Sequence, residues 1–461
     1  MIKILEKVNG LVWGVPALIM LVGIGVYLSV RTGFAQFRLF PLAVRRFWGQ
    51  LLNTSGESEG RSGFRALCTA LAATVGTGNI VGVAGAITIG GPGAIFWMWV
   101  CAFLGMVTKF AEATLSVRYR TQNSLGEYIG GPMYMIRHGM GQKWLPLAYI
   151  YSFFGLVASF GVGNATQINA VIGGVNSTAK AFRWQIPGIT DLFIGLGLGA
   201  IITIMLLGGA KRIGETAEIL VPVASCGYLL VGIFVLVIRH AYVPRAFLDI
   251  IAGAFDPKAV TGGVVGSALA ALRVGASRGV FTNEAGMGTA AIAHGGADVA
   301  HPVDQGLMGI MEVFLDTVVI CTMTALVILC SGTVIPYGTD IGAELTVSAF
   351  SGVLGQWVNI FITLSLCLFA LATVLGWGLY GMRCAEFLFG SSSVRLFALA
   401  QGCVVVLGAV MKSGTVWTFA EIVNGLMVIP NLIALGILSP ELISLVKEYK
   451  ESRCNNKHCS G

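Results

Sequence analysis

Two glycine-rich stretches decide the fold, and the first is TVGTGNIVGVAG at residues 74–85. The second, GVFTNEAGMGTAAIAHG at residues 279–295, places Asn283 and Glu284 beside several glycines. In a helix interior glycine costs about 1 kcal/mol, and a carboxylate deep in a membrane span costs at least ~2.5 kcal/mol. Close packing of helices explains some of the glycines but not the neighbouring Asn and Glu. We therefore predict a helix break in each stretch.

The composition places both stretches inside a membrane protein. Of the 461 residues 56% are apolar and 11% charged, whereas a soluble domain carries about 25% charged residues. About 20 apolar residues cross a bilayer, and we predict an all-α polytopic membrane protein with about 11 transmembrane helices. The expected spans are 11–30, 66–88, 93–117, 146–172, 189–208, 216–238, 265–294, 306–331, 352–382, 394–411 and 416–446.

The distribution of Lys and Arg predicts the orientation. The loop 31–65 carries six arginines, and placing it in the cytoplasm leaves most basic residues on that side. We therefore expect a multi-pass protein of a bacterial plasma (inner) membrane with the N-terminus outside and the C-terminus cytoplasmic. Because the net charge of +7 comes from residues in loops, a nucleic-acid partner is not expected.

The spacing of the two breaks predicts an internal symmetry. They lie in the second and seventh spans, so a repeat of five helices would insert its second copy upside down. We predict a 5+5 inverted repeat with the site at the midplane between two broken helices. The expected units are an extra N-terminal span with a basic loop at 1–65, repeats at 66–240 and 241–450, and a cytoplasmic tail at 451–461.

Five blocks in the same order resemble the alanine or glycine:cation (sodium) symporter family. They are TALAATVGTGNIVGVA at 69–84, GGPGAIFWMWVCAFLG at 90–105, GGPMYMI at 130–136, FTNEAGMG at 281–288 and ATVLGWGLYG at 372–381. The resemblance implies the LeuT-type inverted-repeat architecture. It also implies sodium-coupled symport of small neutral amino acids, namely alanine, glycine and serine, into the cell by alternating access, and no enzymatic activity.

An amino-acid substrate is a zwitterion, so its site needs an anion end and a cation end. A half-helix that starts after Gly78 offers free N–H groups and a positive dipole end to the carboxylate, at the amides of Thr77, Gly78 and Asn79. In the second break, carbonyls near Phe281 and Thr282, next to Asn283, are candidates for the ammonium end. Phe281 is also the expected lid on the outer side.

Three side chains are expected to complete the pocket by resemblance to the family. They are Gln167 in GVGNATQIN (161–169), and Thr373 and Trp377, which share a helix face. Trp377 would restrict the substrate to a small side chain. Without the family, a tryptophan in a span is more often a packing residue, and a glutamine often only bonds a neighbouring helix.

The LeuT-type pattern also implies a sodium site, and no other cofactor is expected. Its ligands would be carbonyls of Ala72, Val75 and Phe369 and the hydroxyl of Thr373. Ala372 stands where the family often has Ser or Thr, so one oxygen is lacking and the coupling ion stays open. A proton would instead need a titratable group.

The candidates for such a proton site are Glu284 first and Glu112 second. We expect Glu284 to accept hydrogen bonds from the backbone at the break, and Lys109 to pair with Glu112 three residues later. The stretch GGPMYMIRHGMG (130–141) is a candidate element of the inner gate.

Two other functions remain as alternatives. A passive channel also uses broken helices and midplane glycines, but it has no need of a pocket for a zwitterion. A membrane enzyme would draw on Glu284, His294 and His301, whose spacing matches no metal-ligand motif. The expected partners are a small neutral amino acid, Na⁺ and the lipid bilayer, and the expected state is a monomer or a weak oligomer.

Overall fold

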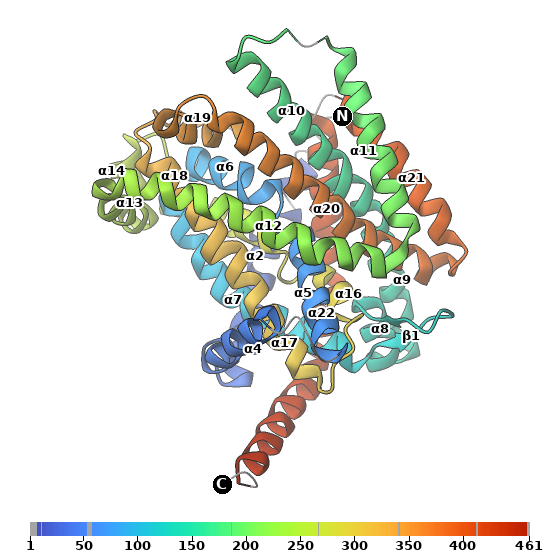
Figure 1. Ribbon diagram of the computed structural model, residues 1–461. Coiled ribbons are helices and arrows are strands. Elements are labelled where there is room, and N and C mark those ends of the chain that lie inside the picture. The colour runs from blue at the N-terminus through green and yellow to red at the C-terminus, as the bar shows by residue number, and fades with distance from the viewer. Residues whose placement is uncertain are drawn as a thin grey trace.

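The computed structural model describes residues 7–10, 12–52, 58–185, 187–265, 267–339, 342–411 and 414–458. Within them the chain is almost entirely helical, as Figure 1 shows, and the all-α prediction is confirmed. The first part contains α2 (Val15–Thr32), α3 (Ala35–Arg38), α4 (Phe40–Leu52), α5 (Ser58–Thr74), η1 (Thr77–Asn79), α6 (Val81–Gly90), α7 (Gly93–Arg118), β1 (Thr121–Gln122), β2 (Tyr128–Ile129), α8 (Pro132–Tyr134), η2 (Met135–Met140) and η3 (Gln142–Trp144).

The middle and last parts continue the same pattern. They contain α9 (Leu145–Phe160), η4 (Gly161–Ala165), α10 (Thr166–Ala181), α11 (Ile189–Leu207), α12 (Gly209–Ile238), η5 (His240–Tyr242), α13 (Val243–Phe255), α14 (Pro257–Thr261), α15 (Ala268–Asn283), α16 (Thr289–His294), α17 (Pro302–Val313), η6 (Phe314–Cys321), α18 (Thr322–Cys330), α19 (Ala343–Leu354), α20 (Val358–Phe389), α21 (Ser393–Val410) and α22 (Gly414–His458). Strands β1 and β2 form a short antiparallel hairpin between α7 and α8.

Most expected spans coincide with long apolar helices. Among the described residues, eight helices are long and apolar enough to cross a membrane, or up to nine if the bent pair around residues 75–76 counts as one span. Two further expected spans correspond to the shorter helix α2 and to the broken pair α15 and α16. The chain is thus a polytopic membrane protein, while the count of eleven and the boundaries of the two repeats stay predictions.

Both predicted helix breaks are present. Helix α5 ends at Thr74, and the following segment, η1 with α6, is bent by 59° relative to it. Helices α15 and α16 are separated by five residues, of which Glu284, Gly286 and Gly288 have φ of 55°, 91° and 77°. A left-handed conformation is costly for a residue other than glycine, so Glu284 is a strained position that its surroundings must hold.

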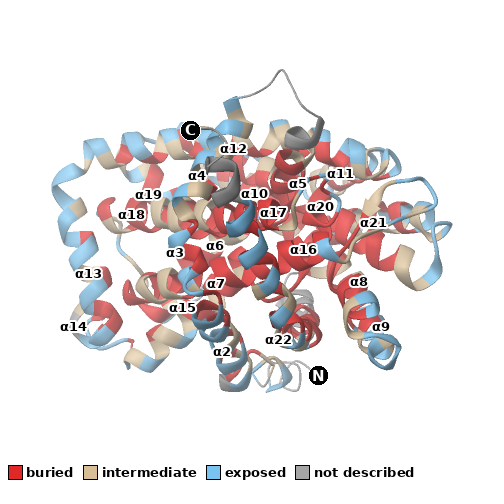
Figure 2. Ribbon diagram, turned by 90° about the horizontal axis from the view of Figure 1, so that it is seen from below, coloured by how far each residue is buried: buried red, intermediate tan, exposed pale blue. Residues whose placement is uncertain are grey.

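Helix α7 lies at the centre of the bundle. Gly91, with φ 72°, turns the chain, and Pro92 precedes the first helical residue, Gly93, so that the helix starts sharply. Helix α7 packs on α15 and α17, and α20 packs on α5 and α9. Figure 2 shows the buried residues gathered along these inner helices, with exposed residues on the outer ones such as α13.

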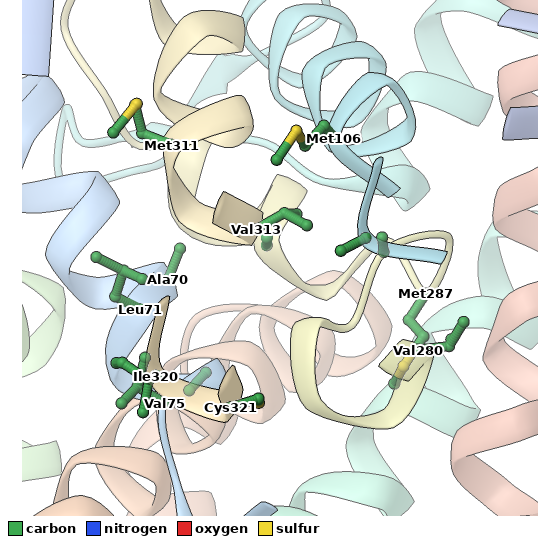
Figure 3. Packing of buried hydrophobic residues seen from close by; sticks show 14 of the residues in the cluster. Ala70, Leu71, Val75, Met106, Val280, Met287, Met311, Val313, Ile320 and Cys321 are labelled. Carbon is green, nitrogen blue, oxygen red and sulfur yellow. The ribbon is translucent and has the colours of Figure 1, made fainter. Parts of the chain in front are cut away.

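Within the described ranges, three segments are π-helical. Such a segment holds one residue more than a regular helical turn and is frequent at functional sites. Segment η4 precedes Gln167, and η6 lies in the middle of the span formed with α17 and α18. In Figure 3, Val75 at the first break lies beside Ile320 and Cys321 of η6. The first break is therefore packed against a π-helical segment.

Candidate functional site

The two breaks face each other at a close approach. A Cβ atom added at Gly78 would lie 3.3 Å from Thr282 Cγ2 and 4.0 Å from Phe281 Cδ1, and one added at Gly82 would lie 3.8 Å from Thr282 Cγ2. Only glycine leaves open space at position 78 between the two segments. The structure thus brings together the residues predicted from both stretches.

Side-chain bonds replace helix bonds at the first break. The amide of Gly76, which in a continuous helix would pair with the Ala72 carbonyl, donates to Asn79 Oδ1 at 2.9 Å. The amide of Asn79 donates to the Gly76 carbonyl at 3.3 Å, so it is not free to bind a carboxylate, contrary to the prediction. Within the described residues, the amides of Thr77 and Gly78 have no hydrogen bond to the protein. These two are the donors that the break offers to a ligand.

The second break offers acceptors instead. In a continuous helix the amides of Ala285 and Gly286 would bond the carbonyls of Phe281 and Thr282. They donate instead to Asn283 Oδ1 at 3.0 Å and to Glu112 Oε1 at 3.0 Å. The two carbonyls predicted for the ammonium end are therefore released from helix pairing. The first break therefore has unpaired hydrogen-bond donors, and the second has unpaired acceptors. A zwitterion requires this combination, because its carboxylate accepts hydrogen bonds and its ammonium group donates them.

Glu284 does not hold the second break through backbone bonds, and that prediction is wrong. Its two oxygens accept from Trp377 Nε1 at 2.9 Å and from Thr289 Oγ1 at 2.6 Å. Glu112 instead accepts the backbone hydrogen bonds at the second break, because its Oε1 accepts from the amides of Gly286 and Gly288. The 174 residues between Glu112 and Gly286 explain why local sequence spacing did not indicate this partner.

The position of Trp377 is fixed by close packing and by one hydrogen bond. Its side chain is fully buried, stands edge-on to Tyr380 with ring centroids 5.6 Å apart, and lies so near Gly163 that any Cβ there would collide with it. Together with its bond to Glu284, this packing fixes the indole across the space between η4 and the second break.

Gln167, Thr77 and Thr373 meet beside the first break. Thr77 Oγ1 donates to Gln167 Oε1 at 2.9 Å, and Gln167 Nε2 donates to the Val162 carbonyl, which the π-helical segment η4 presents. A Cβ at Gly76 would collide with Thr373 Oγ1. Gln167 on α10, Thr77 at the first break and Thr373 on α20 are thus brought to one place.

The predicted sodium ligands lie on two helices in contact. Ala72 is in the last turn of α5 and Val75 directly follows that helix, Phe369 and Thr373 are one turn apart on α20, and α5 and α20 pack together. The buried Thr373 hydroxyl has no hydrogen-bond partner among the described residues. Because buried polar groups are nearly always paired, this oxygen fits a role as a ligand for a cation.

Two residues of η6 were missed by the sequence analysis. Asn79 Nδ2 donates to Asp316 Oδ1 at 2.7 Å, and Asn283 Nδ2 donates to Thr317 Oγ1 at 3.2 Å. Thr317 Oγ1 in turn donates to Asp316 Oδ2 at 2.8 Å. The asparagines of both breaks are therefore tied to one π-helical segment. The available signal was the acidic residue Asp316 inside the apolar span 306–331, four residues after Glu312 in the same span.

Lys109 does not pair with Glu112, and that prediction is also wrong. Its ammonium lies 2.9 Å from Glu312 Oε1 on α17, and the other oxygen of Glu312 lies 2.9 Å from His294 Nε2. His294 Nδ1 lies 2.7 Å from Gln305 Nε2. His294 is thereby engaged in a polar chain, and within the described residues no group of three or more metal-binding side chains could hold a metal ion.

Two cavities approach the breaks from opposite sides. The first, of about 410 Å³, is lined by Trp13, Ile89 at the end of α6, and Phe281. The second, of about 350 Å³, is lined by Arg65 near the start of α5 and by Arg383. Since the two ends of the broken span α5–α6 reach different cavities, the site lies between them. Phe281 lines the first cavity next to the break, where its predicted role as a lid would place it.

Comparison with known proteins identifies the family. The profile of the sodium:alanine symporter family matches residues 1–460. The sodium/alanine symporter AgcS of Methanococcus maripaludis is 41% identical, over 98% of both chains, and the probable sodium/glutamine symporter GlnT of Bacillus subtilis is 36% identical, over 98% of this chain and 92% of its own. The fold resembles the LeuT-fold transporter MhsT, crystallised in complex with L-phenylalanine, with a TM-score of 0.58 and 16% identity over 84% of this chain and 97% of that one. This chain therefore belongs to the sodium:alanine symporter family, and it is a multi-pass membrane transporter that carries an amino acid together with a cation.

Proposed function

We propose that the protein carries small neutral amino acids (alanine, glycine and serine) into the cell together with Na⁺. The observation that carries this proposal is the opposite polarity of the facing breaks. The free amides of Thr77 and Gly78 suit a carboxylate, and the released carbonyls of Phe281 and Thr282 suit an ammonium group. No side-chain charge is needed to bind such a neutral substrate.

The proposed preference for small side chains rests on Trp377. The indole is fixed by Glu284 and packed against Gly163, so it cannot yield space easily. A larger substrate would need that volume. In this proposal Gln167 and Thr77 orient the substrate carboxylate from the side of α10. Asn283 shapes the ammonium end because its side chain accepts the bond of the Ala285 amide, which leaves the Phe281 carbonyl unpaired.

For the coupling ion we propose a sodium site at the carbonyls of Ala72, Val75 and Phe369 and the hydroxyl of Thr373. The unpaired Thr373 oxygen and the Ala72 carbonyl released by Asn79 support this ligand set. Na⁺ prefers oxygen ligands, and the absence of a hydroxyl at Ala372 limits how many the protein provides. No further cofactor is part of the proposal.

The proposed cycle is alternating access. Na⁺ orders the first break, the substrate then bridges both breaks, and Phe281 closes the first cavity. Rocking of one helix bundle opens the second cavity, which we assign to the cytoplasm. Inward movement of one charge gains about 2.3 kcal/mol per 100 mV, which is the source of accumulation. We place the protein in a bacterial inner membrane, N-terminus outside, C-terminus cytoplasmic, as a monomer or weak oligomer.

A second candidate is coupling to protons, which the buried carboxyl group of Glu284 at the break favours. Uptake into proteoliposomes separates the candidates, using labelled alanine, glycine and serine with an inward Na⁺ gradient, an equal K⁺ gradient or an inward proton gradient. We expect accumulation with Na⁺ alone. Accumulation driven only by protons would replace Na⁺ as the coupling ion. Flux that only runs downhill, whichever ion is present, would contradict symport and leave a passive channel.

A further inference from the structure

The interior of the protein carries an excess of acidic groups. Among the described residues around the second break and η6, four carboxyl groups face one lysine and one histidine. All six side chains are 3% exposed or less: Glu112, Glu284, Glu312, Asp316, Lys109 and His294. Even with a charged histidine, four carboxylates would leave a net negative charge in the membrane interior. Such a charge is costly without compensation, so at least one of these groups must be neutralised.

The hydrogen bonds show which carboxyl groups are compensated. Glu312 faces the ammonium of Lys109 with one oxygen and His294 with the other, both at 2.9 Å. Each oxygen of Asp316 accepts a bond, one from Asn79 and one from Thr317. Each oxygen of Glu284 also accepts one bond. In each of these three groups both oxygens have a partner, as expected of carboxylates, which can accept hydrogen bonds on both oxygens.

Glu112 is different, because all its donors are on one oxygen. Its Oε1 accepts from the amides of Gly286 at 3.0 Å and Gly288 at 3.1 Å, and from Asn431 Nδ2 at 2.6 Å. Its Oε2 is buried and has no partner among the described residues. In a carboxylate the two oxygens share the charge, and an unpaired one in the interior is heavily penalised. In a carboxylic acid the unpaired oxygen is a neutral O–H, whose burial without a partner costs much less than that of a charged oxygen.

We propose that Glu112 is a proton-binding site, with the proton on Oε2, and that this proton holds the second break in its present form. The neutral acid keeps a carbonyl oxygen for the two break amides without adding a charge. The side chain of Asn431, which contacts Glu112, also carries an unpaired buried oxygen, Oδ1. Loss of the proton places a second carboxylate near Lys109, whose ammonium is already paired with Glu312.

The groups that face this site come from several helices. Lys109, one turn earlier on α7, and Glu312 on α17 act on Glu112 directly, while Glu284 at the break and His294 on α16 belong to the same network through Lys109 and Glu312. Asp316 lies on η6, and the phenol groups of Tyr151 on α9 and Tyr380 on α20 also interact with Glu112. Lys109 is the only one of these that favours a carboxylate at position 112 by its fixed charge. The carboxyl groups around it oppose a further negative charge and so favour the bound proton.

The test is the infrared spectrum of the purified full-length protein in lipid nanodiscs, without substrate, in Na⁺ and in choline buffers. We expect a carboxylic C=O band at neutral pH that is lost in Glu112→Gln, because glutamine keeps the accepting oxygen but cannot bind the proton. Glu312→Gln is the matched control on the same network, and its difference spectrum should contain carboxylate bands only. Size-exclusion chromatography checks that each variant is folded.

The double variant Glu284→Gln with Asp316→Asn makes the test independent of the folding of Glu112→Gln. It should keep the carboxylic band, because Glu112 is unchanged. Loss of the band in the double variant, or its persistence in Glu112→Gln, would place the proton on another residue and overturn the proposal. Absence of the band in the wild type, with carboxylate bands that shift between Na⁺ and choline, would show a bound cation instead. None of these outcomes depends on which amino acid is transported.

Discussion

Trp377 donates its indole N–H to Glu284 over 2.9 Å, and this bond joins the uninterrupted helix α20 to the break between α15 and α16. The same indole packs against Gly163, which is itself part of the π-helical segment η4. The side chain of Trp377 therefore connects α20 with the second break and with the π-helical segment η4. Its two roles, hydrogen-bond donor and volume filler, can be separated by substitution.

Trp377→Phe should weaken transport of alanine while keeping the preference for small substrates. Phenylalanine retains most of the packing but leaves Glu284 Oε1 without its donor, which costs about 1–3 kcal/mol. Trp377→Ala should admit larger neutral amino acids, because it removes the indole volume. Competition of unlabelled amino acids against labelled alanine measures both effects, and unchanged selectivity in Trp377→Ala would mean that the indole only serves packing.

Ala372→Ser should lower the Na⁺ concentration needed for half-maximal uptake, because it adds a hydroxyl next to the proposed ligand Thr373. Thr373→Ala should raise that concentration by roughly tenfold or more, which corresponds to about 1.4 kcal/mol, and Thr373→Ser should stay close to the wild type. The measurement is initial uptake against Na⁺ concentration at saturating alanine. Equal Na⁺ dependence in all four proteins would remove Thr373 from the site.

Asn79→Ala should raise the alanine concentration needed for half-maximal uptake by more than tenfold. The change removes the acceptor of the Gly76 amide and the donor to Asp316, so the first break loses two of the bonds that fix it. Asn169→Ala is the matched control, since Asn169 is partly exposed on α10 and bonds only the Met411 carbonyl among the described residues. Wild-type uptake in Asn79→Ala would show that the break holds its shape without this side chain.

Gln167→Ala should weaken substrate binding through Thr77, whose hydroxyl it leaves without its acceptor. The loss of one such buried bond costs about 1–3 kcal/mol, equivalent to a roughly 5- to 150-fold weaker affinity. Gln167→Glu keeps an acceptor but brings a negative charge next to the proposed carboxylate site, so we expect it to bind alanine more weakly still. Isothermal titration with alanine in saturating Na⁺ tests this order, and a glutamate variant that binds better than the alanine variant would contradict it.

Glu127→Gln should make the second cavity easier to open. Glu127, on the turn of the β1–β2 hairpin, lies 2.7 Å from Arg383 Nη2, while Glu386 holds the other nitrogen of Arg383 at 2.7 Å. Because Glu386 remains, we expect a change of about 1 kcal/mol at most. The readout is the rate at which a cysteine placed at Ser62, which lines this cavity, reacts with a thiol reagent from the cytoplasmic side. An equal rate with and without the substitution would exclude the hairpin from the gate.

The sequence was sufficient to predict the breaks because the conflict is local. Glycines, an asparagine and a glutamate within a few positions cannot be reconciled with a regular helix in a membrane, wherever the rest of the chain lies. The facing of Gly78 and Thr282 followed from the symmetry of the two stretches. The amides of the first break and the carbonyls of the second were expected from the sequence because a helix that stops and starts again leaves end groups without helix partners.

The partners of the buried charges could not be predicted in this way. The spacing of Lys109 and Glu112 does put them near one face of α7, yet Lys109 pairs with Glu312, 203 residues later. Likewise the Glu112 side chain reaches across to the amides of Gly286 and Gly288. Such pairs depend on how helices pack, which periodicity does not report. Asp316 was visible as an acidic residue in an apolar span, but only the packing of η6 on both breaks gives it a role.

The released main-chain groups at the two breaks have a consequence for the evolution of this transporter. Any point substitution can remove a side chain, but only a change to proline removes a backbone amide N–H and none removes a carbonyl, so the groups offered to the amino and carboxyl ends of a substrate are largely protected from mutation. The residues that can change more freely are the few side chains that enclose the rest of the pocket, above all Trp377. New cargo can then be acquired through a few substitutions, while recognition of the amino-acid backbone is inherited unchanged.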